Sequence, residues 1–209
     1  GWFFDSPVDE LYRQAKLGQF DRNQPLQEIV EKIASLPLYF QPGTKWRYSM
    51  ATDALGHLIQ VASDMPLDTY FKECIFQPLG MVDTDFTVPA DKLDRLAPIY
   101  TSEALYNPTP ILPENVFLIG DITIPTQSPS GGAGLASTIT DYLQFCRCLL
   151  NHGAYDGGQL ISRKTLDWMT ANHIPDHMMP LTVGLEVLDH GFGLGFRVPT
   201  RLGEARTLK

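Results

Sequence analysis

Cysteine is scarce in this sequence: only Cys74, Cys146 and Cys148 occur among 209 residues. An odd count with a C-x-C pair does not form a disulfide framework. Two residues apart on a helix, Cys146 and Cys148 would point about 200° apart, so at least one is expected to be a buried small hydrophobe. No cysteine or histidine cluster has the spacing of metal ligands, and neither a metal nor a cofactor is expected.

The sequence also lacks an excess of positive charge and any long apolar run. Its net charge is -8 at pH 7. Such a chain gains nothing from counterion release on nucleic acid, so no nucleic-acid partner is expected. No stretch is long and apolar enough to span a membrane, and no signal peptide opens the chain. The chain begins at Gly1 rather than Met and stops within a patterned segment at Lys209. A fragment is therefore expected, whose compartment and oligomeric state stay open.

The first hundred residues carry mainly helical patterns. Apolar residues recur at helical spacing between proline and glycine breaks. Ser49 is a candidate N-cap for one of these helices. Alternation of apolar and polar residues over 84–88 predicts a short strand. The expected helices run from about Asp5 to Gly18 and over Gln24–Leu36, Ala51–Ser63 and Pro66–Phe76.

The second half mixes loop, helix and strand patterns. Residues 101–134 are rich in Pro, Gly, Ser and Thr with interleaved aromatics, which predicts a long, ordered loop. Ser137 or Thr138 is expected to cap a helix that continues through Asn151, and Ser162 to cap another. Gly191–Val198 alternates glycine with large apolar residues and predicts a sheet strand. A helical lobe joined to an α/β or α+β lobe suits this order.

Four stretches carry a family resemblance. They are PGTKWRYSMATDALG over Pro42–Gly56, IFQPLGMVDT over Ile75–Thr84, GGAGLASTITDY over Gly131–Tyr142 and GFGLGF over Gly191–Phe196. Together and in this order they resemble the serine β-lactamases of class C and the penicillin-binding proteins. The carboxylesterase branch of that family, family VIII, is the most similar. Several linked motifs are far more specific than any one alone.

The resemblance implies the fold class and the division of the chain. The fold would be α/β (α+β) and β-lactamase/transpeptidase-like, incomplete at both ends. Residues 1–100 would form a mainly helical lobe, 101–134 a long loop bordering the cleft, and 135–209 part of the sheet-and-helix lobe.

The resemblance also implies a covalent serine mechanism with three motifs: a Ser-x-x-Lys, a tyrosine opposite it, and a later motif on a sheet edge. Only the tyrosine, Tyr48, is present here. No serine is followed three residues later by lysine, and Thr69-x-x-Lys72 has that spacing only within an expected helix. The isolated chain is therefore expected to be inactive. The complete protein is expected to hydrolyse a small-molecule ester.

Three other residues are candidates for substrate binding, each with a plainer alternative. Relatives that act on β-lactams usually carry Tyr-x-Asn, whereas Met50 stands at that third position. A thioether cannot donate the amide hydrogen bond, which favours an ester substrate. Trp2 and Phe3 could line an acyl pocket. Alternatively, Met50, Trp2 and Phe3 only fill the core, and Tyr48 is a simple aromatic at a helix start.

Two further functions stay open. The protein could be a β-lactamase or D-Ala-D-Ala carboxypeptidase, or a non-catalytic β-lactamase-like protein that binds a ligand. The last would lack a Ser-x-x-Lys, and so would a truncated enzyme.

Overall fold

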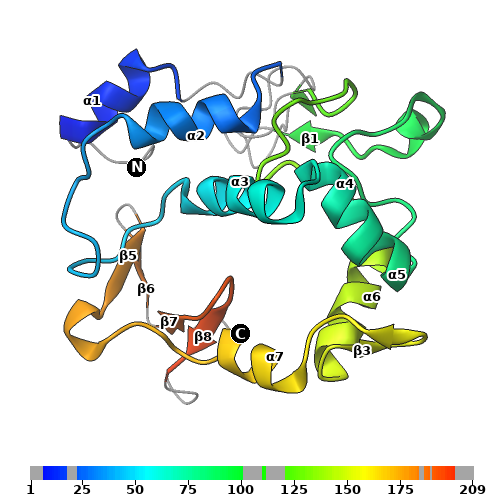
Figure 1. Cartoon of the computed structure of the whole chain (residues 1–209). Coiled ribbons are helices and arrows are strands. Elements are labelled where there is room, and N and C mark those ends of the chain that lie inside the picture. Colours follow the sequence, from blue (N-terminus) through cyan, green and yellow to red (C-terminus); the bar gives the residue numbers. More distant parts are fainter. Residues whose placement is uncertain are drawn as a thin grey trace.

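A computed structural model describes residues 7–17, 23–100, 110–111, 121–183, 186–188 and 190–200. Three helices open it: α1 (Pro7–Gln14), α2 (Leu26–Ala34) and α3 (Ala51–Ser63). Helices α2 and α3 lie side by side (Figure 1). The bounds predicted for α3 are confirmed, whereas α1 and α2 are shorter than predicted. The first helix ends before Lys16, which has a left-handed φ of 54°.

A second helical rod follows α3. It runs through α4 (Leu67–Phe71), a π-helical turn (Lys72–Phe76) and α5 (Gln77–Leu79), and it ends at Gly80 with a φ of 68°. The prediction that this helix stops at Phe76 was wrong. Pro78 would clash with the carbonyl four residues earlier in a regular helix, and the wider π-turn there relieves that clash.

The rest of the described chain contains short helices and strand pairs. The strands form four separate two-stranded antiparallel sheets, β1–β2, β3–β4, β5–β6 and β7–β8. The remaining elements are a 3-10 turn (Ala90–Arg95), β1 (Ile99–Tyr100), β2 (Pro110–Ile111), α6 (Ile139–Leu150), β3 (Ala154–Tyr155), β4 (Gly158–Gln159), α7 (Arg163–Met169), a 3-10 turn (Asp176–Met178), β5 (Leu181–Val183), β6 (Glu186–Leu188), β7 (His190–Phe192) and β8 (Arg197–Pro199).

Two strand predictions were wrong. Residues 84–88 form only one isolated bridge, between Asp85 and Ala136. Gly191–Val198 is not one strand but most of the β7–β8 hairpin, in which Phe192 faces Arg197. Gly195, with a φ of 88°, lets the chain reverse where a continuous strand was expected.

One hydrophobic core lies where α5 meets α6. Phe76, Leu79, Met81 and Cys148 are buried together there. Burial raises the pKa of the Cys148 thiol, which keeps it neutral. Cys146 is only half-buried, so the expectation that one of the two cysteines packs as a hydrophobe is confirmed.

A buried polar network fixes the start of α6. Thr138 is the N-cap, and its hydroxyl accepts from the Asp141 N–H at 3.1 Å. The Asp141 carboxylate in turn accepts from the Thr84 hydroxyl at 2.9 Å and from the Asp83 N–H at 2.7 Å. The expected cap is thus Thr138 rather than Ser137. Through Asp141, the helix is fastened to the loop that follows Gly80.

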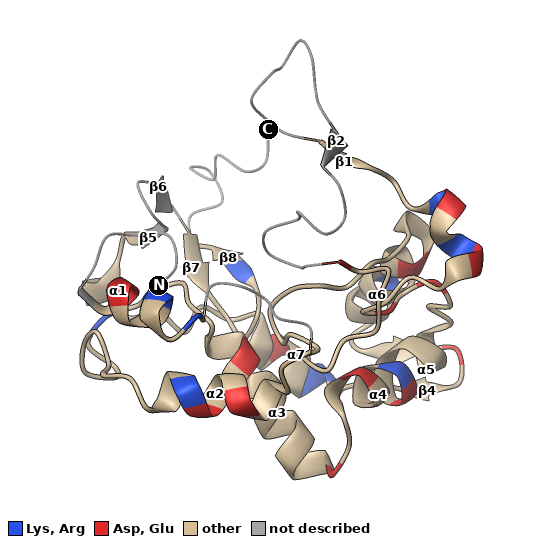
Figure 2. Ribbon diagram, turned by 90° about the horizontal axis from the view of Figure 1, so that it is seen from above, with Lys and Arg blue, Asp and Glu red and all other residues tan. Residues whose placement is uncertain are grey.

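Charges of both signs are mixed along the helices (Figure 2). On α1, for example, the exposed Glu10 and Arg13 lie 2.9 Å apart. Among the helices of the described ranges, none has the length and apolar character needed to cross a membrane.

Candidate functional site

Tyr48 lies immediately before the first turn of α3. Met50 occupies the N-cap position, and its carbonyl accepts from the Asp53 N–H at 3.1 Å. The expectation that Ser49 is the N-cap was wrong. The Ser49 hydroxyl lies one residue too early and instead accepts from the Ala51 N–H at 3.2 Å. The Ser49 hydroxyl and the Met50 carbonyl nevertheless join the Tyr48 segment to the helix by accepting hydrogen bonds from N–H groups of its first turn.

The Tyr48 side chain is 50% exposed. No other described residue forms a hydrogen bond with its phenol, so the hydroxyl is available to a group outside this set. Met50 is half-buried beside it in sequence. Trp2 and Phe3, the other two expected binding residues, lie outside the described residues. The structure therefore keeps Tyr48 and Met50 at one helix start and does not place the aromatic pair.

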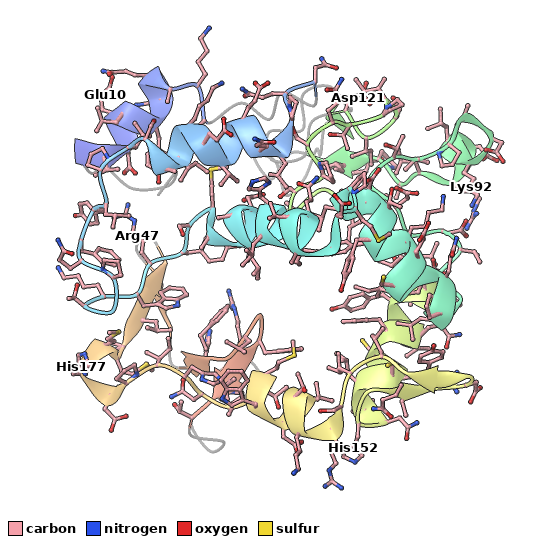
Figure 3. All side chains as sticks on the ribbon, in the orientation of Figure 1. Glu10, Arg47, Lys92, Asp121, His152 and His177 are labelled. Atoms are coloured by element: carbon pink, nitrogen blue, oxygen red, sulfur yellow. The ribbon has the colours of Figure 1, made fainter. Side chains whose placement is uncertain are left out.

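The residues just before Tyr48 are held from two directions. The Arg47 guanidinium lies 3.5 Å from the Asp9 carboxylate of α1 and 4.6 Å from the centre of the Tyr39 ring (Figure 3). The Trp46 ring packs against Phe192 of β7, with 5.5 Å between ring centres. Cation–π and aromatic contacts of this kind fix side-chain orientation as well as position. The segment that enters α3 is thus tied to both α1 and the β7–β8 hairpin.

The first turn of α3 is held by a buried polar pair, Asp53 and Ser130. Their side-chain oxygens lie 2.5 Å apart, and the two residues are 5% and 8% exposed. The Ser130 oxygen also accepts from the N–H groups of Gly132 and Ala133, each at 3.0 Å. Burial raises the pKa of Asp53, although hydrogen bonds from Ser130 and from backbone N–H groups partly offset this effect.

Glycine allows the 130–133 loop to lie directly against α3. A Cβ on Gly131 would overlap the Thr52 carbonyl oxygen, and one on Gly132 would lie 2.5 Å from the Thr52 hydroxyl. On the helix side, a Cβ on Gly56 would lie 2.8 Å from the Leu67 side chain. Sequence reasoning took Gly131–Tyr142 only as a helix entry and missed this contact. Asp53 and Gly56, three residues apart, share one face of the helix and were the available signal.

Several apolar side chains of α3, α7 and the β7–β8 turn are exposed. On α3, Leu55 is 54% and Leu58 is 59% exposed. Trp168 of α7 is 62% exposed, and Leu194 in the β7–β8 turn is 43% exposed. In Figure 1, α3 runs across the middle of the picture, and α7 and the β7–β8 hairpin lie below it. Leu55 and Leu58, three residues apart, lie on one face of α3.

Two hollows among the described residues, of about 480 and 490 Å³, lie around α5 and the loops beside α6. Neither is lined by Tyr48 or Met50. Within the described ranges, no group of three or more His, Cys, Asp or Glu side chains could hold a metal ion. What the site offers chemically is a positioned, solvent-accessible phenol.

The fold is that of the β-lactamase/transpeptidase-like class. The family model described as Beta-lactamase matches residues 3–205. This chain therefore belongs to the β-lactamase family of serine hydrolases, which confirms the resemblance expected from the sequence. The fold expected from it, α/β (α+β) and β-lactamase/transpeptidase-like, is confirmed as well.

Individual relatives include an esterase. The chain is 32% identical over 215 residues to Protein Rv1367c of Mycobacterium tuberculosis strain H37Rv, covering 100% of this chain and 50% of that protein. It is 33% identical over 137 residues to Esterase EstB of Burkholderia gladioli, covering 59% of this chain and 34% of that enzyme.

Among solved structures, EstCE1 is described as a hydrolase with promiscuous acyltransferase activity. It aligns with a TM-score of 0.71 at 29% identity, covering 94% of this chain and 52% of EstCE1. The chain thus spans about half the length of Rv1367c and of EstCE1.

Proposed function

We propose that the protein carrying this chain is a carboxylesterase that hydrolyses small-molecule esters through a covalent serine mechanism, with Tyr48 as the proton-transfer residue. The observation that supports this most directly is the Tyr48 phenol. It is half exposed and free of hydrogen bonds to the described residues, yet its backbone is anchored on both sides.

The chemistry follows from the acidity of tyrosine. A phenol has a pKa of about 10, so it is a poor base at neutral pH until a nearby ammonium group favours the phenolate. In the proposed reaction, the Tyr48 phenolate takes the proton of a serine hydroxyl as that oxygen attacks the ester carbonyl. The tetrahedral intermediate then expels the alcohol, which receives the proton back from Tyr48. Water hydrolyses the acyl-enzyme through the same proton transfers in reverse.

The serine and lysine are proposed to belong to the part of the family domain that this chain does not span. The chain contains no Ser-x-x-Lys. The exposed Leu55, Leu58 and Trp168 offer that remaining part an apolar surface. Isolated from it, the 209-residue chain is expected to have no esterase activity.

Met50 supports an ester over a β-lactam substrate. It stands two residues after Tyr48, at the N-cap of α3, where relatives that act on β-lactams usually carry asparagine. Its thioether accepts hydrogen bonds only weakly and cannot donate one. A β-lactam side-chain amide would lose one partner there, whereas a simple ester needs none.

The test is the intact mass of the complete protein and of the 209-residue chain after treatment with a fluorophosphonate probe. One adduct on the complete protein and none on the isolated chain is expected, together with hydrolysis of nitrophenyl butyrate only by the former. Tyr48→Phe should lower kcat by about 100-fold or more, since a positioned acid–base group contributes about 10² to 10⁴.

Other outcomes identify the alternatives. A complete protein that takes up no probe and hydrolyses no ester would be a non-catalytic relative. Turnover of a penicillin or of a D-Ala-D-Ala peptide above that of nitrophenyl butyrate would indicate a β-lactamase or a carboxypeptidase.

A further inference from the structure

We infer that Asp53 and Ser130 are positioning residues for Tyr48: their buried hydrogen bond fixes the first turn of α3, and this turn sets where the phenol lies. The inference rests on the proposed function, because it assigns these two residues a part in the same proton transfer. Neither residue touches the substrate in this proposal. Both act through the backbone between residues 48 and 53.

The Ser130 hydroxyl uses its full hydrogen-bonding capacity in this contact. A serine hydroxyl has one proton to donate and two lone pairs. Ser130 gives its proton to the Asp53 carboxylate at 2.5 Å and accepts from two backbone N–H groups, those of Gly132 and Ala133. Because the oxygen is almost fully buried, water cannot replace any of these three bonds without displacing the loop.

Two glycines of the loop extend its contact with α3. Gly131 brings its backbone against the Thr52 carbonyl, at a place where any side chain would collide. Gly132 lies against the Thr52 hydroxyl in the same way. The loop therefore contacts two consecutive residues of the first turn, Thr52 and Asp53. A shift of the loop would have to move that turn with it.

A short path of hydrogen bonds carries this constraint to Tyr48. The Asp53 and Ala54 N–H groups donate to the Met50 carbonyl, and the Ala51 N–H donates to the Ser49 hydroxyl. The residue before Tyr48 is fixed independently, by the Arg47 contacts with Asp9 and Tyr39. With no hydrogen bond from described residues to the phenol itself, the backbone on its two sides determines its place.

The molecule contains a matched pair that can serve as a control. Asp141 holds the same third helical position in α6 and accepts from the buried Thr84 hydroxyl at 2.9 Å. Both pairs fasten a helix start to a distant loop. The two pairs differ in location. Helix α6 lies at the right of Figure 1, whereas Arg47, which precedes Tyr48, is labelled at the left of Figure 3 in the same orientation. A merely structural role would give the two pairs the same phenotype.

The experiment compares Ser130→Ala, Ser130→Thr and Thr84→Val in the complete protein with nitrophenyl butyrate. Ser130→Ala should lower kcat by about 10- to 100-fold with KM within about 2-fold, since misplacement of a reacting group by about 1 Å can cost 10². Ser130→Thr keeps the hydroxyl and should restore most of kcat. Thr84→Val should lower the melting temperature comparably but leave kcat within about 2-fold.

A spectroscopic readout reports the position of the ring directly. With 3-fluorotyrosine at position 48, the fluorine resonance should move in Ser130→Ala and stay in place in Thr84→Val. Gly132→Ala offers a second variant if Ser130→Ala folds poorly, since it keeps both side chains and pushes the loop off Thr52. It should move the resonance and lower kcat in the same direction.

The results separate the two proposals. If Tyr48→Phe abolishes turnover while Ser130→Ala and Gly132→Ala keep the wild-type kcat and resonance, the positioning role is overturned and the proposed function stands. If Tyr48→Phe keeps full activity, the proposed mechanism fails, whatever the Ser130 variants show. A kcat loss in Thr84→Val as large as that in Ser130→Ala would reduce the Asp53–Ser130 pair to a structural contact.

Discussion

The Trp46 ring packs on Phe192, with 5.5 Å between ring centres and 47° between ring planes. The two residues come from distant parts of the chain. Trp46 precedes the Tyr48 segment, and Phe192 ends β7 in the hairpin near the C-terminal end of the described chain. Leu194, two residues after Phe192, donates its N–H to the Met169 carbonyl at the end of α7. This aromatic contact is one of several that join the helical half to the later half.

This contact predicts a measurable coupling. A tilted aromatic pair contributes about 0.5 to 1.5 kcal/mol beyond the area it buries. A double-mutant cycle of Trp46→Leu and Phe192→Leu, measured by urea unfolding, should therefore give a coupling energy in that range. Tyr142→Leu with Phe145→Leu is a matched cycle on α6, where the rings lie 6.2 Å apart and Tyr142 is exposed. Additive effects of the Trp46 and Phe192 substitutions on the free energy of unfolding would show that the two rings are not coupled.

The Asp9–Arg47 pair should matter far more than the exposed pair on the same helix. The side chains of Asp9 and Arg47 are 5% and 18% exposed, whereas those of Glu10 and Arg13 are 55% and 62% exposed. Removing one partner of a buried ion pair costs about 3 to 5 kcal/mol, and an exposed pair is worth at most about 1 kcal/mol. Chemical denaturation of Asp9→Asn and Glu10→Gln measures both. Equal, small losses in the two variants would show that the Arg47 contact does not anchor this segment.

Local signals in the sequence predicted some of this architecture well. The bounds of α3 follow from a regular apolar spacing with a turn before it and Pro66 after it, and all of these act within a few residues. The same holds for Thr138 and Ser162, whose side chains cap the helices they precede. Tyr48 and Met50 were identified through the family resemblance. Their position at one helix start depends only on adjacent residues.

Long-range contacts explain what the sequence did not reveal. The Asp53–Ser130 hydrogen bond joins residues with no regular spacing, so no periodic pattern encodes it. The alternation over 191–198 predicts one strand where the structure has a hairpin, because alternation alone does not say where a chain reverses. Gly195, with its left-handed φ, is the local signal of that reversal. Ser49 was predicted as the N-cap of α3, but the N-cap is Met50, one residue later, and the sequence pattern does not resolve a difference of one residue.

Asp53 should give stability a pH dependence of unusual sign. Burial raises the pKa of Asp53 above its ordinary value of 3.8. At pH values between 3.8, the ordinary pKa, and the raised pKa of the folded state, the folded state binds more protons than the unfolded state. The contribution of Asp53 to stability therefore falls as pH rises from about 3.8 and then levels off. The melting temperature of wild type minus that of Asp53→Asn should therefore decrease as pH increases through that range.

Asp83 supplies a control of opposite sign. The Arg95 and Lys92 side chains, each 2.6 Å from its carboxylate, lower the pKa of Asp83 from 3.8 to about 2. Its contribution to stability is therefore present above 3.8 and is lost as pH falls toward 2. The difference between wild type and Asp83→Asn should increase with pH over that acid range. Two difference curves with the same slope would contradict the assignment of Asp53.

Met50→Asn should shift the substrate preference toward β-lactams. The substitution introduces an amide two residues after Tyr48, at the N-cap of α3. Asparagine is also a favoured residue at helix N-caps. One added hydrogen bond is worth about 1 kcal/mol, so the ratio of kcat/KM for a penicillin to that for nitrophenyl butyrate should rise by about 5-fold. The complete protein is assayed with both substrates.

Met50→Leu is the matched control, because it conserves apolar volume without adding a donor. It should leave the substrate ratio unchanged and alter stability by less than about 1.5 kcal/mol. A ratio that rises equally in Met50→Leu and Met50→Asn would mean that the loss of the thioether, not the gain of the amide, is responsible. An unchanged ratio in Met50→Asn, with the fold intact, would show that position 50 only fills space at the start of α3.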